Sequence, residues 1–364
     1  MKALRLLGQR QLQVDEVAPP TAPGPHELLL DNRLCGICGT DLHEYADGPK
    51  LVTSAPHALT GAGLPQILGH EFSAEVVAVG REVTAARVGD RVCVMPLFFC
   101  GHCAACRAGR QQCCTRLGAV GYNWRWGGMG ESAIVADHQV ARLPDAMTDA
   151  QGALVEPTAV AVHAVSSAPV QVGDNVLVTG GGPIGQLVAL SAVAAGAGAV
   201  FLSEPNPRRR RRAACLGLTG VFDPTVSDVV GELREAFPDG LDVAIECAGN
   251  QRALEACIDS VRPGASVVQT ALHPRPVQLD PTRLTLRDVS LRGVNCFPVT
   301  SWPRVIRLIA SGRLPAERVV TGEVPLTRAI EDGFHALLDP DSDHIKILVA
   351  ATRSEEHTSE LQSQ

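Results

Sequence analysis

The chain has no uninterrupted apolar run of membrane length, and the segment from Met1 to Val17 alternates apolar and polar residues instead of forming the apolar block of an export signal. We therefore expect a cytoplasmic protein without a membrane partner. An excess of positive charge is also lacking, because the formal net charge is -7. This balance excludes a general electrostatic attraction to nucleic acid and leaves the basic run Arg208 to Arg212 as a local feature.

The remaining composition fits an enzyme of two domains. With 364 residues and 45% hydrophobic content, the chain is long enough to bury two cores. Up to about Ala150, short strand-like runs broken by Gly and Pro predict an irregular, mostly β domain. From Val170 onward, buried strands alternate with helices, which predicts an α/β domain with a doubly wound parallel sheet. Its predicted strands are 175–179, 199–203, 221–223, 242–246, 266–270 and 289–293.

The C-terminal part is harder to place. After Pro298, a helix around 304–310 and a strand around 346–350 are expected, but periodicity does not assign them to either domain. The last residues, Arg353 to Ser363, read RSEEHTSELQS and resemble the translation of a sequencing-adapter oligonucleotide. We interpret 353–364 as an artefact of that kind or as a disordered polar tail, without a functional role.

Cysteine spacing is the first chemical signal. Twelve cysteines in a chain without an export signal favour metal ligation over disulfides, because cytosolic thiols are kept reduced. Four of them follow the pattern C-x2-C-x2-C-x7-C, namely Cys100, Cys103, Cys106 and Cys114. Four closely spaced thiolates on a loop predict a closed, structural zinc site. An iron-sulfur cluster could use the same ligands, and the adjacent Cys113 is out of register.

A second, looser set combines three kinds of ligand: Cys38 in a Cys-Gly-Thr-Asp loop, His70 and Glu71 in Gly-His-Glu, and Glu156 in Val-Glu-Pro. One thiolate, one imidazole and one carboxylate would leave a fourth zinc position open, as a catalytic zinc requires. Taken one at a time, these residues are more often core or surface side chains than ligands.

A glycine loop follows the strand 175–179 and opens an apolar helix. Its residues fit G-x-G-x-x-G and are Gly180, Gly181, Gly182, Pro183, Ile184 and Gly185. In that context, glycine lets the backbone approach a pyrophosphate, and the helix N-terminus offers free N–H groups to hold it. A tight turn without a ligand is the alternative.

The next strand ends at Glu204, the position of the acid that binds the adenosine ribose hydroxyls in dinucleotide sites. A carboxylate there would repel a 2'-phosphate, so NAD is preferred over NADP. The neighbouring run from Arg208 to Arg212 weakens this preference, because an arginine can accept that phosphate.

These motifs occur in one order, together with Val-Gly-Asp-Arg-Val at 88–92, and the chain so resembles the zinc-dependent medium-chain alcohol dehydrogenases from Met1 to about Ala350. Within that family, the stretches His43-Glu-Tyr and Pro56-His-Ala-Leu-Thr-Gly look most like the 2,3-butanediol dehydrogenase branch, with sorbitol and threonine dehydrogenases as near neighbours.

The resemblance implies a GroES-like catalytic domain over 1–157 with both zinc sites, a Rossmann domain over 158–297, and a segment over 298–352 that returns to the catalytic domain. It also implies two zinc ions per chain, NAD, and a homodimer or homotetramer. The catalytic ligands would be Cys38, His70 and Glu156, with Glu71 as a neighbouring or exchangeable ligand. Asp41 would orient the site from behind, while Thr40 and His43 would form the proton relay.

The implied reaction oxidises a small secondary alcohol or vicinal diol to the ketone. Zinc would lower the pKa of the bound hydroxyl, so that an alkoxide can pass a hydride to NAD. Sorbitol or L-threonine are alternative substrates. A non-catalytic, metal-stabilised NAD-binding protein is an alternative of another class, but it would not need the joint set of Cys38, Thr40, His43, His70 and Glu156. One departure from the family is the loop from Tyr122 to Gly127, whose two tryptophans either line the substrate cleft or pack on the surface.

Overall fold

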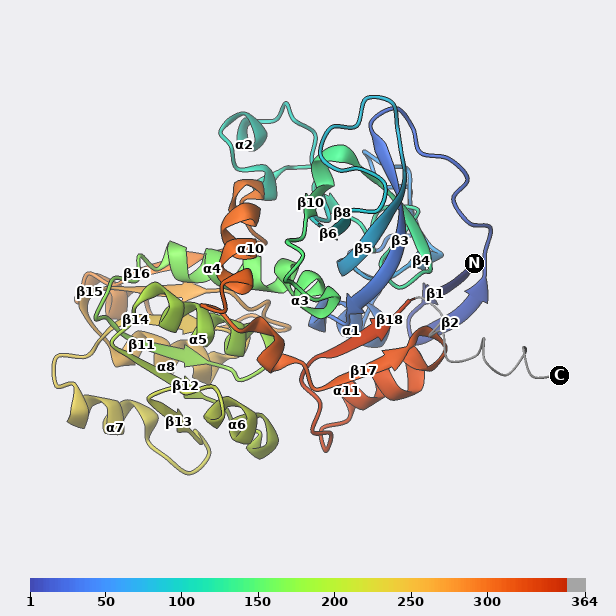
Figure 1. Cartoon of the computed structure of the whole chain (residues 1–364). Helices are drawn as coiled ribbons and strands as arrows, with labels where there is room; N and C mark the ends of the chain where they lie inside the picture. Colours follow the sequence, from blue (N-terminus) through green and yellow to red (C-terminus); the bar gives the residue numbers. More distant parts are fainter. Residues whose placement is uncertain (352–364) are drawn as a thin grey trace. The chain divides into compact units, whose positions relative to one another are not determined.

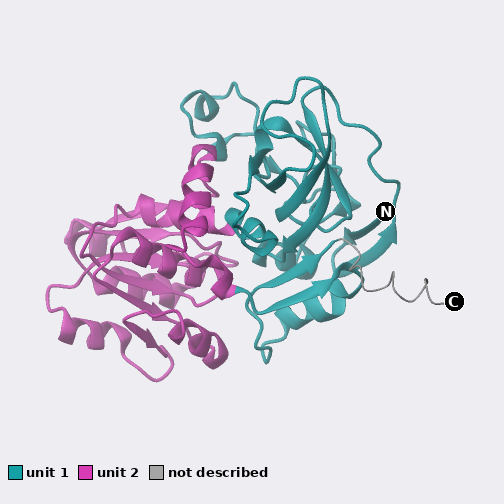
Figure 2. Ribbon diagram, viewed as in Figure 1, with its two compact units in different colours: residues 1–156, 320–364 teal, residues 157–319 magenta. Residues whose placement is uncertain are grey.

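The structure, a computed structural model, describes residues 1–351 of the chain and divides it into two compact units. Met1–Glu156 form the first unit together with the chain from Val320 onward, and Pro157–Val319 form the second, as coloured in Figure 2. Within the described residues, every helix is too short or too polar to cross a bilayer. The predicted adapter-derived tail lies outside the described residues.

The second unit is built on a parallel sheet of six strands in the order β13-β12-β11-β14-β15-β16 (Figure 1). Every neighbouring pair in this sheet is parallel. This order is that of a doubly wound dinucleotide-binding sheet, so the predicted fold class is confirmed. The strands are β11 (Asn175–Thr179), β12 (Ala199–Ser203), β13 (Gly220–Phe222), β14 (Leu241–Glu246), β15 (Val261–Gln269) and β16 (Ser290–Gly293).

Helices connect these strands, and local capping explains where several of them begin. They are α5 (Pro183–Ala195), α6 (Pro207–Ala214), α7 (Val229–Ala236), α8 (Gln251–Ser260) and α9 (Pro281–Thr285), while α10 (Trp302–Ala310) follows the last strand of the sheet. The Asn206 side chain accepts hydrogen bonds from the first N–H groups of α6, and Asn250 does the same for α8. The sheet interior is apolar on both faces, with Leu177, Ala244 and Val267 fully buried.

The first unit is mostly β. Its largest sheet has the strand order β10-β6-β5-β3-β18-β17, with β9 also paired to β3, and a second sheet has the order β2-β1-β4. The strands are β1 (Lys2–Gly8), β2 (Gln11–Glu16), β3 (Glu27–Gly36), β4 (Gln66–Ile67), β5 (Glu71–Val79), β6 (Arg91–Val94), β7 (Leu97–Phe98), β8 (Gly118–Ala119), β9 (Ser132–Ala136), β10 (Val140–Arg142), β17 (Gly322–Pro325) and β18 (Ile347–Ala350). Its helices include α1 (Gly39–Ala46), α2 (Ala104–Arg107) and α3 (Asp149–Ala153), while α4 (Val155–Ser167) begins at the junction of the two units.

The C-terminal strand β18 pairs antiparallel with β3, and Leu348 lies opposite Gly36. The end of the chain therefore completes the first unit. The segment that returns to the first unit begins at Val320 and not at residue 298, because 298–319 belong to the second unit. There the ring of Trp302 packs 5.1 Å from that of Phe297, and Arg318 donates a hydrogen bond to the carbonyl of Leu216. The apolar stripe of α10, which includes Val305, Ile306 and Ile309, is buried.

Candidate functional site

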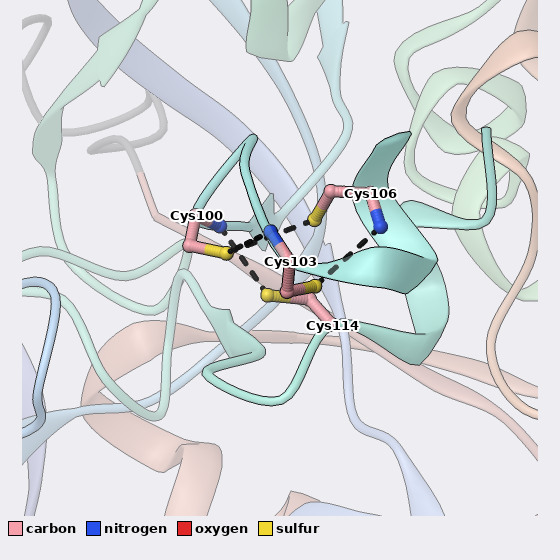
Figure 3. A group of neighbouring side chains, drawn as sticks. All are labelled: Cys100, Cys103, Cys106 and Cys114. Atoms are coloured by element: carbon pink, nitrogen blue, oxygen red, sulfur yellow. Dashed lines mark hydrogen bonds between the residues drawn. The ribbon is translucent and has the colours of Figure 1, made fainter. Parts of the chain in front are cut away.

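The four-cysteine loop brings all its sulfur atoms together. The Sγ atoms of Cys100, Cys103, Cys106 and Cys114 lie within 4.8 Å of one another (Figure 3), and those of Cys100 and Cys106 are 3.9 Å apart. A tetrahedral zinc with zinc–sulfur bonds of about 2.3 Å places its ligand sulfurs about 3.8 Å apart. The observed spacing therefore fits one zinc ion, and the exposed Cys113 is outside this group.

Backbone N–H groups point at these sulfurs, as expected of a loop made to hold thiolates. Cys100 N–H lies 3.3 Å from the Cys114 sulfur, and Cys103 N–H lies 3.4 Å from the Cys100 sulfur. Hydrogen bonds from the backbone of Cys106 and Thr115 lower the pKa of Cys103 to about 6, whereas burial raises the pKa of Cys106 to about 12. A cation at the centre would allow all four groups to be thiolates.

A second cluster lies in the first unit, where the ligand atoms of Cys38, His70 and Glu71 come within 4.8 Å of one another. Cys38 caps helix α1, and Asp41 accepts a hydrogen bond from Cys38 N–H in return. His70 directly precedes β5, whose first residue is Glu71. Local capping and the start of one strand thus bring a thiol, an imidazole and a carboxyl together.

Asp41 lies behind this cluster and is fully buried. Its Oδ2 accepts from Cys38 N–H at 2.9 Å, while its Oδ1 accepts from the Tyr122 hydroxyl at 3.0 Å and lies 3.7 Å from His70 Nδ1. Burial raises the pKa of Asp41, and the neighbouring imidazole of His70 opposes that rise. Asp41 therefore lies next to both the Cys38 backbone and the His70 ring.

Sequence reasoning missed the contribution of Tyr122. Its ring packs 4.8 Å from the His70 ring, and its hydroxyl satisfies the buried Asp41. The two tryptophans of the same loop go elsewhere. Trp124 donates from Nε1 to the Ile134 carbonyl at 2.7 Å, and Trp126 is buried in a small cluster with Ala3 and Ile67. The loop thus contributes its tyrosine to the site and its tryptophans to the core.

Lys346 is a second residue that the sequence analysis missed. It is 1% exposed, and its ammonium donates to the Ile37 carbonyl at 2.9 Å and to Glu71 Oε2. A Cβ at Gly36 would overlap both partners of this ion pair, so a larger residue there would displace the pair. The available signal was a single lysine inside the apolar run 345–350, a position that otherwise predicts a buried strand residue.

Glu156 is buried in the first turn of α4, but its carboxylate is not among the three ligand groups that lie within 4.8 Å of one another. Burial raises its pKa to about 7, while the nearby charge of His70 acts in the opposite direction. The structure thus brings Glu71 closest to Cys38 and His70, with Glu156 in the same electrostatic environment. Removing either carboxylate separately would identify the ligand.

The two relay candidates both lie on α1. Thr40 is partly buried, and its backbone N–H points at the Cys38 sulfur at 3.4 Å. His43 is exposed one turn further along, with Nδ1 at 3.4 Å from Asp47 Oδ2. Thr40 therefore lies next to the metal cluster, and His43 lies at the solvent.

The glycine loop of the second unit connects β11 to α5. Gly180 has a φ of +94°, and a Cβ atom there would lie 2.8 Å from Ala248 N. A Cβ at Gly185 would overlap the Gly180 carbonyl, so both positions require glycine. Helix α5 begins at Pro183, with Ile184 and Gly185 in its first turn, and no side chain caps it at Gly182. Its N-terminus is therefore available to an anionic ligand.

Glu204 is buried directly beside this loop. Its carboxylate accepts from Gly181 N–H at 2.5 Å and from Asn206 N–H at 2.8 Å. Arg209 is also close, because its Nη1 lies 4.0 Å from the position of a Cβ on Gly182. The structure thus places both the acid and one arginine of the basic run at the glycine loop.

Two families match the chain: residues 24–145 match the alcohol dehydrogenase GroES-like domain, and residues 183–311 match the zinc-binding dehydrogenases. The (R,R)-butanediol dehydrogenase of Bacillus subtilis is 36% identical over 352 residues, which cover 96% of this chain and 99% of that protein. The chain belongs to the zinc-binding alcohol dehydrogenase family. The resemblance inferred from its motifs is confirmed.

Solved structures of this family agree with the fold. The crystal structure of 2R,3R-butanediol dehydrogenase from Bacillus subtilis has a TM-score of 0.90 at 35% identity, covering 96% of this chain and 99% of that one. A putative zinc-binding dehydrogenase from Sinorhizobium meliloti, bound to NADP, has a TM-score of 0.86 at 32% identity, with 96% and 98% covered. The expected combination of a GroES-like and a Rossmann domain is thereby confirmed.

As a zinc-binding alcohol dehydrogenase, the chain is an oxidoreductase that acts on CH–OH groups, with zinc and a nicotinamide dinucleotide as cofactors. The expected near neighbours also appear. A sorbitol dehydrogenase of Bacillus subtilis is 29% identical over 97% of this chain and 98% of its own length, and an L-threonine 3-dehydrogenase of Mesorhizobium japonicum is 32% identical over 95% and 98%.

Proposed function

We propose that the enzyme interconverts a small vicinal diol and its hydroxyketone, with 2,3-butanediol and acetoin as the favoured pair, using NAD. The observation that carries this proposal is the convergence of Cys38, His70 and Glu71 within 4.8 Å, backed by the buried Asp41. Similarity to butanediol dehydrogenases over nearly the whole chain supports the diol as substrate.

We assign a structural zinc to Cys100, Cys103, Cys106 and Cys114, and a catalytic zinc to Cys38 and His70. Glu156, which is buried in the same electrostatic environment, is the proposed third ligand of the catalytic zinc. Glu71 is the exchangeable alternative, because its Oε2 is already paired with Lys346. The donor set of one thiolate, one imidazole and one carboxylate fits a zinc that keeps an open position. When bound, zinc supplies Lewis acidity that lowers the pKa of the substrate hydroxyl.

The chain's own residues would then supply orientation and proton transfer. Asp41 holds the Cys38 backbone through a hydrogen bond, and its other oxygen, 3.7 Å from His70 Nδ1, would orient the ring. Thr40 lies beside the cluster, and its hydroxyl would accept the substrate proton while passing its own toward His43 by way of the nicotinamide ribose. His43, exposed on the same helix, would pass that proton to water.

In the second unit, Gly180, Gly182, Pro183, Ile184 and Gly185 would hold the pyrophosphate, and Glu204 would receive the adenosine ribose. Because Glu204 is buried and faces the loop, NAD is the proposed cofactor. NADP is the second candidate, favoured by Arg209 at the same loop. If NAD is preferred, NADH binds more tightly than NADPH, and replacing Arg209 with Ala leaves that ratio unchanged.

The deciding experiment follows NADH formation by absorbance on zinc-loaded protein. The panel contains (R,R)-, meso- and (S,S)-2,3-butanediol, sorbitol, L-threonine and simple secondary alcohols, each with and without a chelator. Chelator-sensitive turnover of one butanediol isomer is the expected result. Turnover of sorbitol or L-threonine alone would move the substrate to the corresponding relatives. No turnover with both zinc ions bound would refute the proposed reaction.

The zinc content of two variants shows whether Glu156 or Glu71 is the zinc ligand. Glu156→Gln should lose the catalytic zinc and keep the structural one, leaving one ion per chain. Glu71→Gln should keep both. The reverse result would make Glu71 the permanent ligand.

A further inference from the structure

A polar cluster lies at the carboxyl edge of the Rossmann sheet and has no part in the assignments above. Glu246 ends β14 and pairs with Thr179 of β11 on one side and with Gln269 of β15 on the other. His273 follows β15 and completes the cluster, which we call the β14–β15 cluster: Glu246, Gln269 and His273. Sheets of this order bind ligands at this edge, where β11 and β14 lead in opposite directions.

The glycine loop is the immediate neighbour of this cluster. A Cβ at Gly180 would meet Ala248 N at 2.8 Å, so the loop packs against the turn that follows Glu246. The pyrophosphate loop and Glu204 occupy the β11–β12 side of the edge. A dinucleotide has a second half, which must then lie across the β14–β15 side.

Glu246 is fully buried, and its carboxylate accepts three hydrogen bonds within and next to the cluster. Its Oε1 accepts from the N–H groups of Ala248 and Gly249, each at 2.7 Å. Its Oε2 accepts from Gln269 Nε2 at 2.6 Å and lies 3.4 Å from His273 Nε2. One carboxylate thus fixes the turn and the amide of Gln269, and it lies beside the imidazole of His273.

Two polar groups of the cluster have no hydrogen-bond partner within the described residues. The ring nitrogens of His273 are both buried without such a partner, although the side chain as a whole is 15% exposed, and the amide oxygen of Gln269 is in the same situation. Buried polar atoms are normally paired, because leaving them unpaired costs stability. The carboxylate beside Nε2 favours the proton on that atom, which leaves Nδ1 as an acceptor.

We propose that His273, held by Glu246, binds the nicotinamide–ribose half of the dinucleotide, with Gln269 Oε1 as a companion acceptor. The chemistry matches, because the carboxamide and the ribose hydroxyls are neutral donors that can pair with an imidazole nitrogen and an amide oxygen. This inference rests on the proposed dinucleotide site of the second unit. It adds contacts that distinguish the complete dinucleotide from its adenosine half.

The test compares binding of NADH and of ADP, which lacks the nicotinamide and its ribose, by calorimetry on the full-length zinc-loaded protein. His273→Ala should weaken NADH binding about five- to tenfold, the effect of losing one buried hydrogen bond, and leave ADP binding within about twofold. His273→Asn, which keeps a polar side chain, should recover part of the loss. His26→Ala, which removes an exposed imidazole in the first unit, is the matched control and should change neither ligand.

Unchanged NADH binding in both His273 variants would overturn the inference, and so would an equal loss for NADH and ADP. Failure of the wild-type protein to bind either ligand would instead overturn the dinucleotide site itself, and the His273 assignment with it. Melting curves of the two variants identify a folding defect, and His273→Asn then supplies the comparison.

Discussion

At the residue scale, the feature that most needs a physical account is a lysine that is almost completely buried. Lys346 and Glu71 are each 1% exposed and form a direct ion pair next to Cys38. Desolvation of two charges costs much of what their attraction contributes, so such a pair is weak evidence for stability. Its effect is to hold one oxygen of Glu71, and thereby to decide how that carboxylate faces the metal cluster.

Removing one partner should be far more damaging than removing both charges. Lys346→Met leaves the Glu71 carboxylate buried and unpaired, and we expect a loss of about 3–5 kcal/mol in the free energy of unfolding. The double variant Lys346→Met with Glu71→Gln should recover much of it, because no charge remains buried. Urea unfolding measures both changes. A single variant as stable as the wild type would show that Glu71 finds another partner or is protonated.

The exposed His43 allows proton transfer to be tested apart from metal binding. His43→Ala should slow turnover by about 10²-fold and leave two zinc ions per chain, since proton relays contribute on that order. Cys38→Ser is the contrasting variant and should lose one zinc ion and nearly all activity. Steady-state kinetics with metal analysis checks both. Full activity in Cys38→Ser would remove that residue from the ligand set.

At the scale of elements, the loop from Cys100 to Cys114 contains only the short helix α2 and one further turn, and it has little apolar core of its own. We therefore expect Cys103→Ser to lower the melting temperature and to remove the structural zinc, because metal binding contributes directly to folding of such a loop. Cys113→Ser changes an exposed cysteine one residue away from Cys114 and should have no effect. Equal melting temperatures for the two variants would contradict a structural zinc.

The loop between β11 and α5 makes a second prediction at this scale. Gly185→Ala places a methyl group on the Gly180 carbonyl, so the loop must move. We expect NADH binding to weaken at least tenfold, while the four-cysteine site keeps its zinc. Gly8→Ala is the control, because it lies in the first unit and a Cβ there makes only ordinary contacts, at 3.6 Å or more, with the Gln11 side chain. Titration with NADH distinguishes the two, and equal affinities would mean that the loop does not carry the ligand.

At the scale of the whole molecule, the two units have different tasks. The first holds both candidate zinc sites, and the second holds the glycine loop, Glu204 and the β14–β15 cluster. Both the N-terminal and the C-terminal parts of the chain contribute to the first unit, because β18 pairs with β3. Truncation before Lys346 would therefore remove both Lys346 and the strand β18 from the unit that binds metal.

Ligand binding should stabilise the folded molecule by mass action. NADH at about 100 times its dissociation constant is expected to add about 2.7 kcal/mol to the free energy of unfolding of the unit that binds it. NADPH at the same concentration should add less, because Glu204 would oppose a 2'-phosphate. Differential scanning calorimetry gives both shifts. A larger stabilisation by NADPH than by NADH would indicate that Arg209 binds the 2'-phosphate, and it would reverse the proposed cofactor preference.

The sequence by itself determined the parts of this protein that depend on short spacings. The spacing of the four-cysteine loop, the glycine loop and the alternation of strands and helices are local patterns. The predicted strands 175–179 and 199–203 match β11 and β12. Likewise, the capping of α1 by Cys38 and Asp41 follows from residues three positions apart.

Only the tertiary structure decided which distant groups meet. Lys346 and Glu71 are 275 positions apart in the chain, and Tyr122 reaches Asp41 across 81 positions. Neither pair has a periodic or spaced signal, because sheet pairing and burial bring them together. Tertiary packing also decides that Glu71, and not Glu156, joins Cys38 and His70 within 4.8 Å. It likewise places the imidazole of His273 beside Glu246. Contacts of this kind depend on the packing of whole strands, which local sequence does not encode.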